Sequence, residues 1–133
     1  MTTTQWSRSK AWAADTAHIA DARRFVQQHL VAQGRPDVVA DACLLVSELA
    51  TNAIIHARTA FAVTLSITGN AVRLEVSDRS PAPPVIADVT HDDDSGRGLR
   101  IVAGLAHDWG VTRDPAGGKS VWASILTVPR QRA

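Results

Sequence analysis

A single helix-length segment, residues 37–57, constrains the fold more than any other part of the chain. It holds neither glycine nor proline, and its apolar residues recur at helical spacing. One continuous apolar stripe is formed by Val38, Ala42, Val46, Leu49 and Ala53. Such a stripe has to be covered by a sheet or another helix. We therefore expect a core helix over this segment, with Asp37 as its N-cap directly after Pro36.

A second, polar stripe lies on the same predicted helix. Glu48, Asn52 and His56 are spaced i, i+4 and i+8, so all three face one side. A carboxylate and an amide are costly to bury unpaired, so this side is either solvated or part of a site. Glutamate beside asparagine suits phosphoryl transfer, because the carboxylate orients a hydroxyl or water and the amide oxygen binds Mg²⁺. The pattern alone supports both alternatives equally, and His56 fits a packing or capping role better than a catalytic one.

The other periodicities predict helices and strands on both sides of this segment. The expected elements, in chain order, are a helix over 15–33, hairpin strands over 61–67 and 72–76, a short helix over 99–107, and strands over 109–112 and 120–128. This order predicts an α+β fold, a two-layer α/β sandwich with the helices on one face of a mainly antiparallel sheet. We expect a single domain over 1–133, with a core of about 14–128, an N-terminal arm or edge strand, and a frayed tail after 128.

Composition narrows the class of protein. With 133 residues, 45% of them hydrophobic and 20% charged, the chain suits one globular domain. A formal net charge of +1 is too balanced for most nucleic-acid or anionic-membrane binders, so neither kind of partner is expected. Cys43 is the only cysteine, which excludes an intrachain disulfide. No signal peptide or membrane span is predicted, and we expect a cytoplasmic protein.

Further segments can carry chemistry, although each also has a simpler explanation. Gly96-Arg97-Gly98 precedes a predicted helix, where its backbone N–H groups would approach an anion, or it is a plain turn. Asp78, at a strand end, would accept a hydrogen bond from an exocyclic amine, or it belongs to an ordinary turn. Gly117-Gly118-Lys119-Ser120 fits a hairpin turn. For the acidic run 91–94 a solvated loop is favoured over a metal site, because no second ligand group follows at a fixed spacing.

These features occur in the order found in the GHKL superfamily of Bergerat-fold ATPases. The chain resembles the small single-domain branch of that superfamily, the anti-sigma-factor serine kinases and their regulatory relatives, over residues 14–128. The resemblance is carried by LLVSELATNAIIHA at 44–57, the strand ending at Asp78, SGRGLRIV at 95–102, WGV at 109–111 and GGKSVW at 117–122. The first block is highly specific, and the last is not.

The resemblance implies a role for each matching residue. Glu48 would be the general base, Asn52 the Mg²⁺ ligand and Asp78 the acceptor for the adenine amino group of ATP. Ser80 would lie in the adenine-binding segment, and Ser120 would take the place of a family threonine on the adenine side. The phosphate-facing turn at the start of the short helix would be formed by Gly96, Arg97, Gly98 and Leu99. Residues 85–95 would form a lid over ATP.

The resemblance also implies a regulatory function. The expected protein is a homodimer that binds ATP with Mg²⁺ and phosphorylates a serine of a small partner in a partner-switching circuit. Its partners would be a sigma factor, an anti-anti-sigma-type protein, or both. One departure favours a different class: Ser80 and Ala82 stand where the family commonly has glycines, and a Cβ there can obstruct a ligand. The alternative is a non-catalytic protein-binding regulator with weak or absent nucleotide binding.

Overall fold

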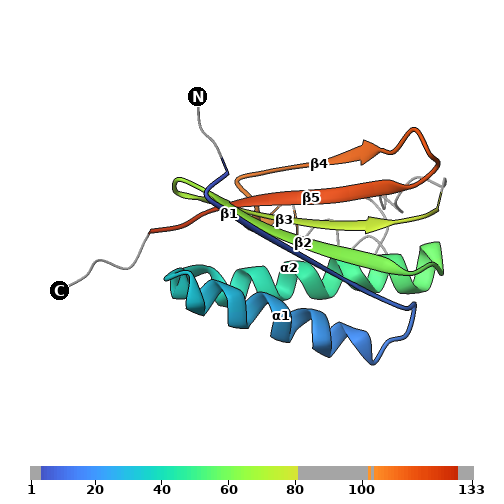
Figure 1. Cartoon of the computed structure of the whole chain (residues 1–133), viewed down its shortest axis with the longest axis horizontal. Coiled ribbons are helices and arrows are strands. Elements are labelled where there is room, and N and C mark those ends of the chain that lie inside the picture. Colours follow the sequence, from blue (N-terminus) through green and yellow to red (C-terminus); the bar gives the residue numbers. More distant parts are fainter. Residues whose placement is uncertain (1–3, 81–101, 103, 129–133) are drawn as a thin grey trace.

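The sheet predicted by the alternating segments is present, and two helices cover one of its faces (Figure 1). The structure is a computed structural model and describes residues 4–80, 102 and 104–128. The strands are β1 (Trp6–Trp12), β2 (Phe61–Thr68), β3 (Ala71–Asp78), β4 (Asp108–Arg113) and β5 (Lys119–Leu126). They form one sheet in the order β1-β2-β3-β5-β4, in which every neighbouring pair is antiparallel. The expected α+β sandwich is confirmed.

The helical layer consists of α1 (His18–Ala32) and α2 (Val39–Asn52), which pack side by side (Figure 1). The apolar stripe predicted for the core helix is buried throughout, from 0% exposed to 4% exposed. The alternating apolar residues of β2 and β3 are buried against the same layer. By length and composition the helical run Pro36–Ala57 is apolar enough to cross a membrane, but here its stripe forms the core of the sandwich.

The start of the second helix differs from the expectation. Residues Pro36–Val38 form a 3-10 turn, and Val38 rather than Asp37 is the N-cap of α2. The Asp37 carboxylate instead accepts hydrogen bonds from the Thr127 hydroxyl at 2.9 Å and from the Val128 N–H at 2.8 Å. Asp37 was wrongly predicted as a cap because its partners lie far along the chain. It joins the end of the sheet to the start of the helix.

The second helix also ends irregularly. Residues Ala53–Ala57 form a π-helical turn, closed by a hydrogen bond of 2.9 Å from the Arg58 N–H to the Ala53 carbonyl. Just before this turn, the hydroxyls of Ser47 and Thr51 donate to carbonyls four residues back, a contact that bends helices. His56 lies within this π turn and is exposed. The expectation that it shares a face with Glu48 and Asn52 stays a prediction.

The two ends of the described chain complete the sheet. The N-terminal segment is the edge strand β1, with Trp6 opposite Ile67 and Trp12 opposite Phe61 in β2.

The short predicted helix is helical at Val102, Gly104 and Leu105 and ends there, two residues earlier than expected. Residues 99–101 and 103 of that prediction lie outside the described residues. β5 likewise ends earlier than predicted, at Leu126.

Candidate functional site

Two residues expected to act on phosphate lie one turn apart on α2. Glu48 precedes Asn52 by four residues, and Asn52 is the last residue of α2 before the π turn. Both residues are half-buried. They are therefore neither in the core nor on a fully solvated helix face, and both groups remain accessible to a ligand. A π turn beside them is a further sign of function, since such turns occur frequently at functional sites.

The carboxylate of Asp78 is held by Lys119 and by a backbone N–H. Lys119 Nζ lies 3.0 Å from each carboxylate oxygen, and the Ser80 N–H donates to Oδ1 at 2.9 Å. The side chains of Lys119 and Asp78 are only 7% and 6% exposed. A carboxylate offers about four acceptor positions, and the contacts within the described residues use three of them. Asp78 is thus a buried, charge-paired acceptor.

Lys119 is the site residue that the sequence analysis missed. Asp78 is the last residue of β3 and Lys119 the first of β5, and the strand register sets them directly opposite each other. Strand alternation contains the signal, because Lys119 shares a face with the buried Val121 and Ala123. The lysine was instead assigned to a hairpin turn, where a charged side chain needs no partner.

Ser120 lies on the other face of the sheet. Its hydroxyl is 2.8 Å from that of Ser77, its cross-strand neighbour. Because successive strand residues point to opposite faces, Ser120 is separated by the sheet from the carboxylate of Asp78. The structure brings Lys119, and not Ser120, beside that carboxylate.

Gly118 allows this pairing of β3 and β5. A Cβ built on Gly118 would collide with the carbonyl oxygen of Asp78. That neighbour is backbone and cannot turn aside, so any larger residue would displace the end of β3. The glycine expected in a plain turn therefore has a second role, since it lets the two strands approach at the Asp78 carboxylate.

The phosphate-facing part of the predicted site lies outside the described residues. This holds for Gly96, Arg97, Gly98 and Leu99, and for the lid predicted over 85–95 with its acidic run. Over residues 4–80, 102 and 104–128, no group of three or more His, Cys, Asp or Glu side chains is arranged to hold a metal ion. A metal held by the described part would need ligands from other groups, such as amides, water or phosphate.

Comparison with known proteins gives one family match. The family model described as histidine kinase-like ATPase domain matches residues 12–125. No curated protein matches the chain.

Solved structures with the same fold include two from bacteria. The RsbU and RsbW domains of Rv1364c from Mycobacterium tuberculosis superimpose with a TM-score of 0.71 at 19% identity, covering 97% of this chain and 35% of that one. The histidine kinase domain of the blue-light-activated histidine kinase EL346 from Erythrobacter litoralis gives a TM-score of 0.51 at 23% identity, covering 84% and 60%. At these identities the likeness is one of fold. The chain spans about a third of the length of the first of these structures.

Proposed function

The chain belongs to the histidine kinase-like ATPase domain family, and from this premise we propose that it is an ATP-binding regulator that phosphorylates a serine of a small partner protein. The observation that carries the proposal is the buried Asp78 carboxylate at the end of β3, held by Lys119 and by the Ser80 N–H. An acceptor of this kind matches the exocyclic amine of adenine. Glu48 and Asn52, both half-buried on one helix, supply a base and an amide oxygen.

Each of these groups has a distinct task in the proposed reaction. Asp78 accepts a hydrogen bond from the adenine amine, and Lys119 orients that carboxylate through its ion pair. Asn52 would hold Mg²⁺ through its amide oxygen, and the ion, when bound, offsets the negative charge of the phosphates. Glu48 accepts the proton of the substrate hydroxyl as the serine oxygen becomes a nucleophile. The donor set fits Mg²⁺, a hard cation that takes few protein oxygens and completes its shell with water and phosphate.

The partners and setting are part of the same proposal. We expect a cytoplasmic homodimer that acts in a partner-switching circuit on a sigma factor, an anti-anti-sigma-type protein, or both, and so regulates transcription. The proposal of a regulatory role is supported by the fold shared with a chain that contains RsbU and RsbW domains.

A second candidate function is a protein-binding regulator that lacks catalysis. It is favoured by Ser80, which is 9% exposed and stands where the family commonly has glycine. A buried side chain at this place narrows the space for a base beside Asp78. In this case nucleotide binding would be weak or absent.

The melting temperature with and without saturating Mg-ATP separates the two candidates. A ligand at 100 times its Kd adds about 2.7 kcal/mol to stability, which moves the Tm of a small domain by several degrees. We expect that shift in the wild type and in Asn70→Ala, which removes an amide from the β2–β3 turn, but not in Asn52→Ala. The absence of a shift in the wild type would refute the ATP-dependent function and support the second candidate.

A further inference from the structure

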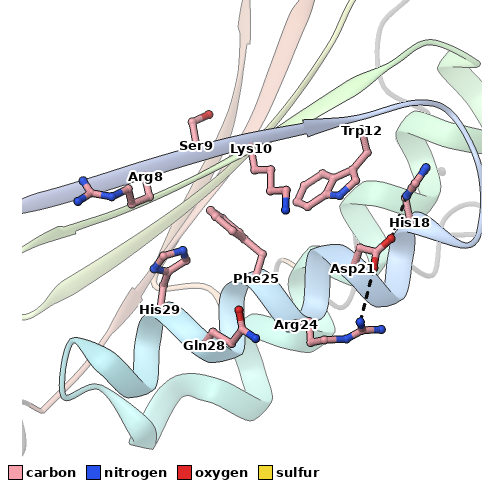
Figure 2. Close-up of a pocket in the computed structure, with 10 residues that line it drawn as sticks. All are labelled: Arg8, Ser9, Lys10, Trp12, His18, Asp21, Arg24, Phe25, Gln28 and His29. Atoms are coloured by element: carbon pink, nitrogen blue, oxygen red, sulfur yellow. Dashed lines mark hydrogen bonds and ion pairs between the residues drawn. The ribbon is translucent and has the colours of Figure 1, made fainter.

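A groove of about 610 Å³ lies between the edge strand β1 and helix α1 (Figure 2), and neither Asp78 nor Asn52 is among the described residues that line it. Its main walls are formed by Arg8, Lys10 and Trp12 of β1 and by Asp21, Arg24 and Phe25 of α1. Aromatic rings form a continuous row beside it. Phe25 contacts Trp12 and His29 with ring centroids 5.9 Å and 4.7 Å apart. The groove is therefore built on a rigid aromatic base and open to solvent at the sheet edge.

The groove carries an excess of positive charge. Arg8, Lys10 and Arg24 are all exposed, whereas Asp21 is the only acidic residue among the described residues that line it. The Asp21 carboxylate already has partners, with His18 Nδ1 at 2.9 Å and Arg24 Nη1 at 3.7 Å. Within the described part of the chain, neither Arg8 nor Lys10 has a carboxylate at ion-pair distance. Arg8 lies over the Trp6 ring and Lys10 over the Trp12 ring, each 5.6 Å from the ring centroid. Lys10 also lies near enough to Asp21 to lower the pKa of that carboxyl, so among the described lining residues three cations face one carboxylate.

The spacing of these cations matches an extended peptide. Arg8 and Lys10 are two residues apart on β1, so their side chains point to the same face about 7 Å apart along the strand. An adjacent strand presents every second side chain to that face with the same repeat. Directly opposite residues of opposite charge stabilise such a pair, and like charges destabilise it. The strand therefore favours a partner whose carboxylates alternate with other residues.

Among the described residues, one backbone edge of β1 has no strand beside it. β1 is the first strand in the sheet order and pairs with β2 on one side only. Its five central residues, between Trp6 and Trp12, are all exposed. A free edge can accept an added strand through main-chain hydrogen bonds. The lysine and arginine on it would repel basic strands and attract acidic ones, which gives selectivity for acidic segments.

We propose that the edge of β1 and the groove beneath it form a docking site for an extended acidic segment of a partner protein. The segment adds to the sheet beside β1, and its alternate carboxylates pair with Arg8 and Lys10. Carboxylates that reach further into the groove meet Arg24. This site is independent of the proposed nucleotide chemistry, because none of its residues lies on β3, β5 or α2.

A titration followed by ¹H–¹⁵N NMR tests the proposal with defined probes. The first probe is a blocked peptide of about eight residues in which Glu alternates with Thr, a length that matches β1. We expect the amide signals of β1 and the first half of α1 to move. A second peptide of the same composition, with its glutamates in contiguous pairs (Glu-Glu-Thr-Thr repeated), should bind about tenfold more weakly, because no two of its glutamates are two residues apart to meet both cations. A third, with a central Thr replaced by Pro, should also bind weakly, because Pro removes a ladder donor.

Matched charge reversals complete the test. Lys10→Glu should weaken binding of the alternating peptide about tenfold, whereas Arg23→Glu, an exposed cation of α1 outside this groove, should not. Unchanged melting temperatures of both variants would establish that each is folded. Equal binding of the alternating and contiguous peptides would show plain charge attraction and overturn strand addition. Equal weakening by both variants, or signal changes that follow self-association of the protein instead of added peptide, would overturn the site.

Discussion

Lys119 Nζ lies 3.0 Å from both carboxylate oxygens of Asp78, where β3 ends and β5 begins. Both side chains are almost fully buried. Removing either partner leaves an uncompensated charge out of water, which costs far more than a surface ion pair gains. The ion pair therefore stabilises the contact between β3 and β5 and, at the same time, fixes the carboxylate that is proposed to recognise adenine.

Breaking this pair from one side should be strongly destabilising. We expect Lys119→Met to lower the free energy of unfolding by about 3 kcal/mol or more. The double variant Asp78→Asn/Lys119→Met buries no lone charge, so its loss should be smaller than the sum of the two single losses. Urea denaturation of the wild type, the single variants Lys119→Met and Asp78→Asn, and the double variant gives the coupling free energy between the two groups. Strictly additive losses would show that the two groups do not stabilise each other.

The proposed base can be separated from nucleotide binding by one glutamate replacement. Glu48→Gln keeps the size and polarity of the side chain but cannot accept a proton, so phosphate transfer to a partner should fall about 10²-fold or more. The Tm shift with Mg-ATP should remain. Glu75→Gln, the same change at the only other glutamate of the chain, is the matched control and should leave transfer unaltered. Transfer that persists in Glu48→Gln would remove Glu48 from the reaction.

Adding one methyl group at Gly118 should disturb the site. In Gly118→Ala the new Cβ would meet the Asp78 carbonyl, and backbone shifts of this kind cost about 1–3 kcal/mol. Gly104→Ala is the control, because its Cβ meets nothing within 4 Å and alanine favours the helix. Thermal unfolding should show a lower Tm for the first variant and an equal or higher Tm for the second. An unchanged Tm for Gly118→Ala would mean that a Cβ at Gly118 fits beside the Asp78 carbonyl without displacing β3.

The contact between Asp37 and the end of β5 should make stability depend on pH. Partial burial would raise the pKa of Asp37, but hydrogen bonds from the Val128 N–H and the Thr127 hydroxyl outweigh it and hold the pKa below its ordinary value of 3.8. A lowered folded-state pKa stabilises the protein above the unfolded pKa, and this contribution is lost as the pH falls through the folded value.

Two variants test that dependence. Asp37→Asn should cost about 1 kcal/mol or less near neutral pH, since the carboxylate is exposed and screened. Its deficit relative to the wild type should shrink below pH 4. Thr127→Val removes one donor and keeps the charge, so the pKa of Asp37 should rise toward its ordinary value, as measured by NMR titration. A deficit of Asp37→Asn that is constant down to low pH would contradict this account.

Much of the fold was predictable because it follows from local periodicity. The buried stripe of α2, the β2–β3 hairpin around Gly69-Asn70 and the order of elements all depend on residues close in sequence. Asp37 was not predictable in the same way. Its preference for capping is local, but its partners, Thr127 and Val128, are brought to it only by the folded sheet.

The candidate site shows the same division. The expectation for Glu48 and Asn52 came from their spacing on one helix and from the family resemblance, and their role stays a prediction. The place of Lys119 beside Asp78 follows only from the register of β3 and β5. The assignment of Ser120 rested on resemblance to a motif, and motif resemblance does not fix which face of a strand a residue occupies. His56 illustrates a further limit, because it lies in a π turn, and a regular helical wheel does not represent such a turn.

β1 precedes both helices in the chain and yet pairs with β2, which follows them. When β1 pairs with β2, the segment between them, which contains both helices, becomes a closed loop. Closing this loop costs chain entropy before the contacts between the two strands can offset that cost. The β2–β3 hairpin closes across a two-residue turn and should form early in folding, with β1 docking late. A strand that docks late and lies at an edge is also among the first to detach in native-state fluctuations. Slow hydrogen exchange should therefore be confined to the central strands, while the edge offered to a partner opens and closes in the folded protein.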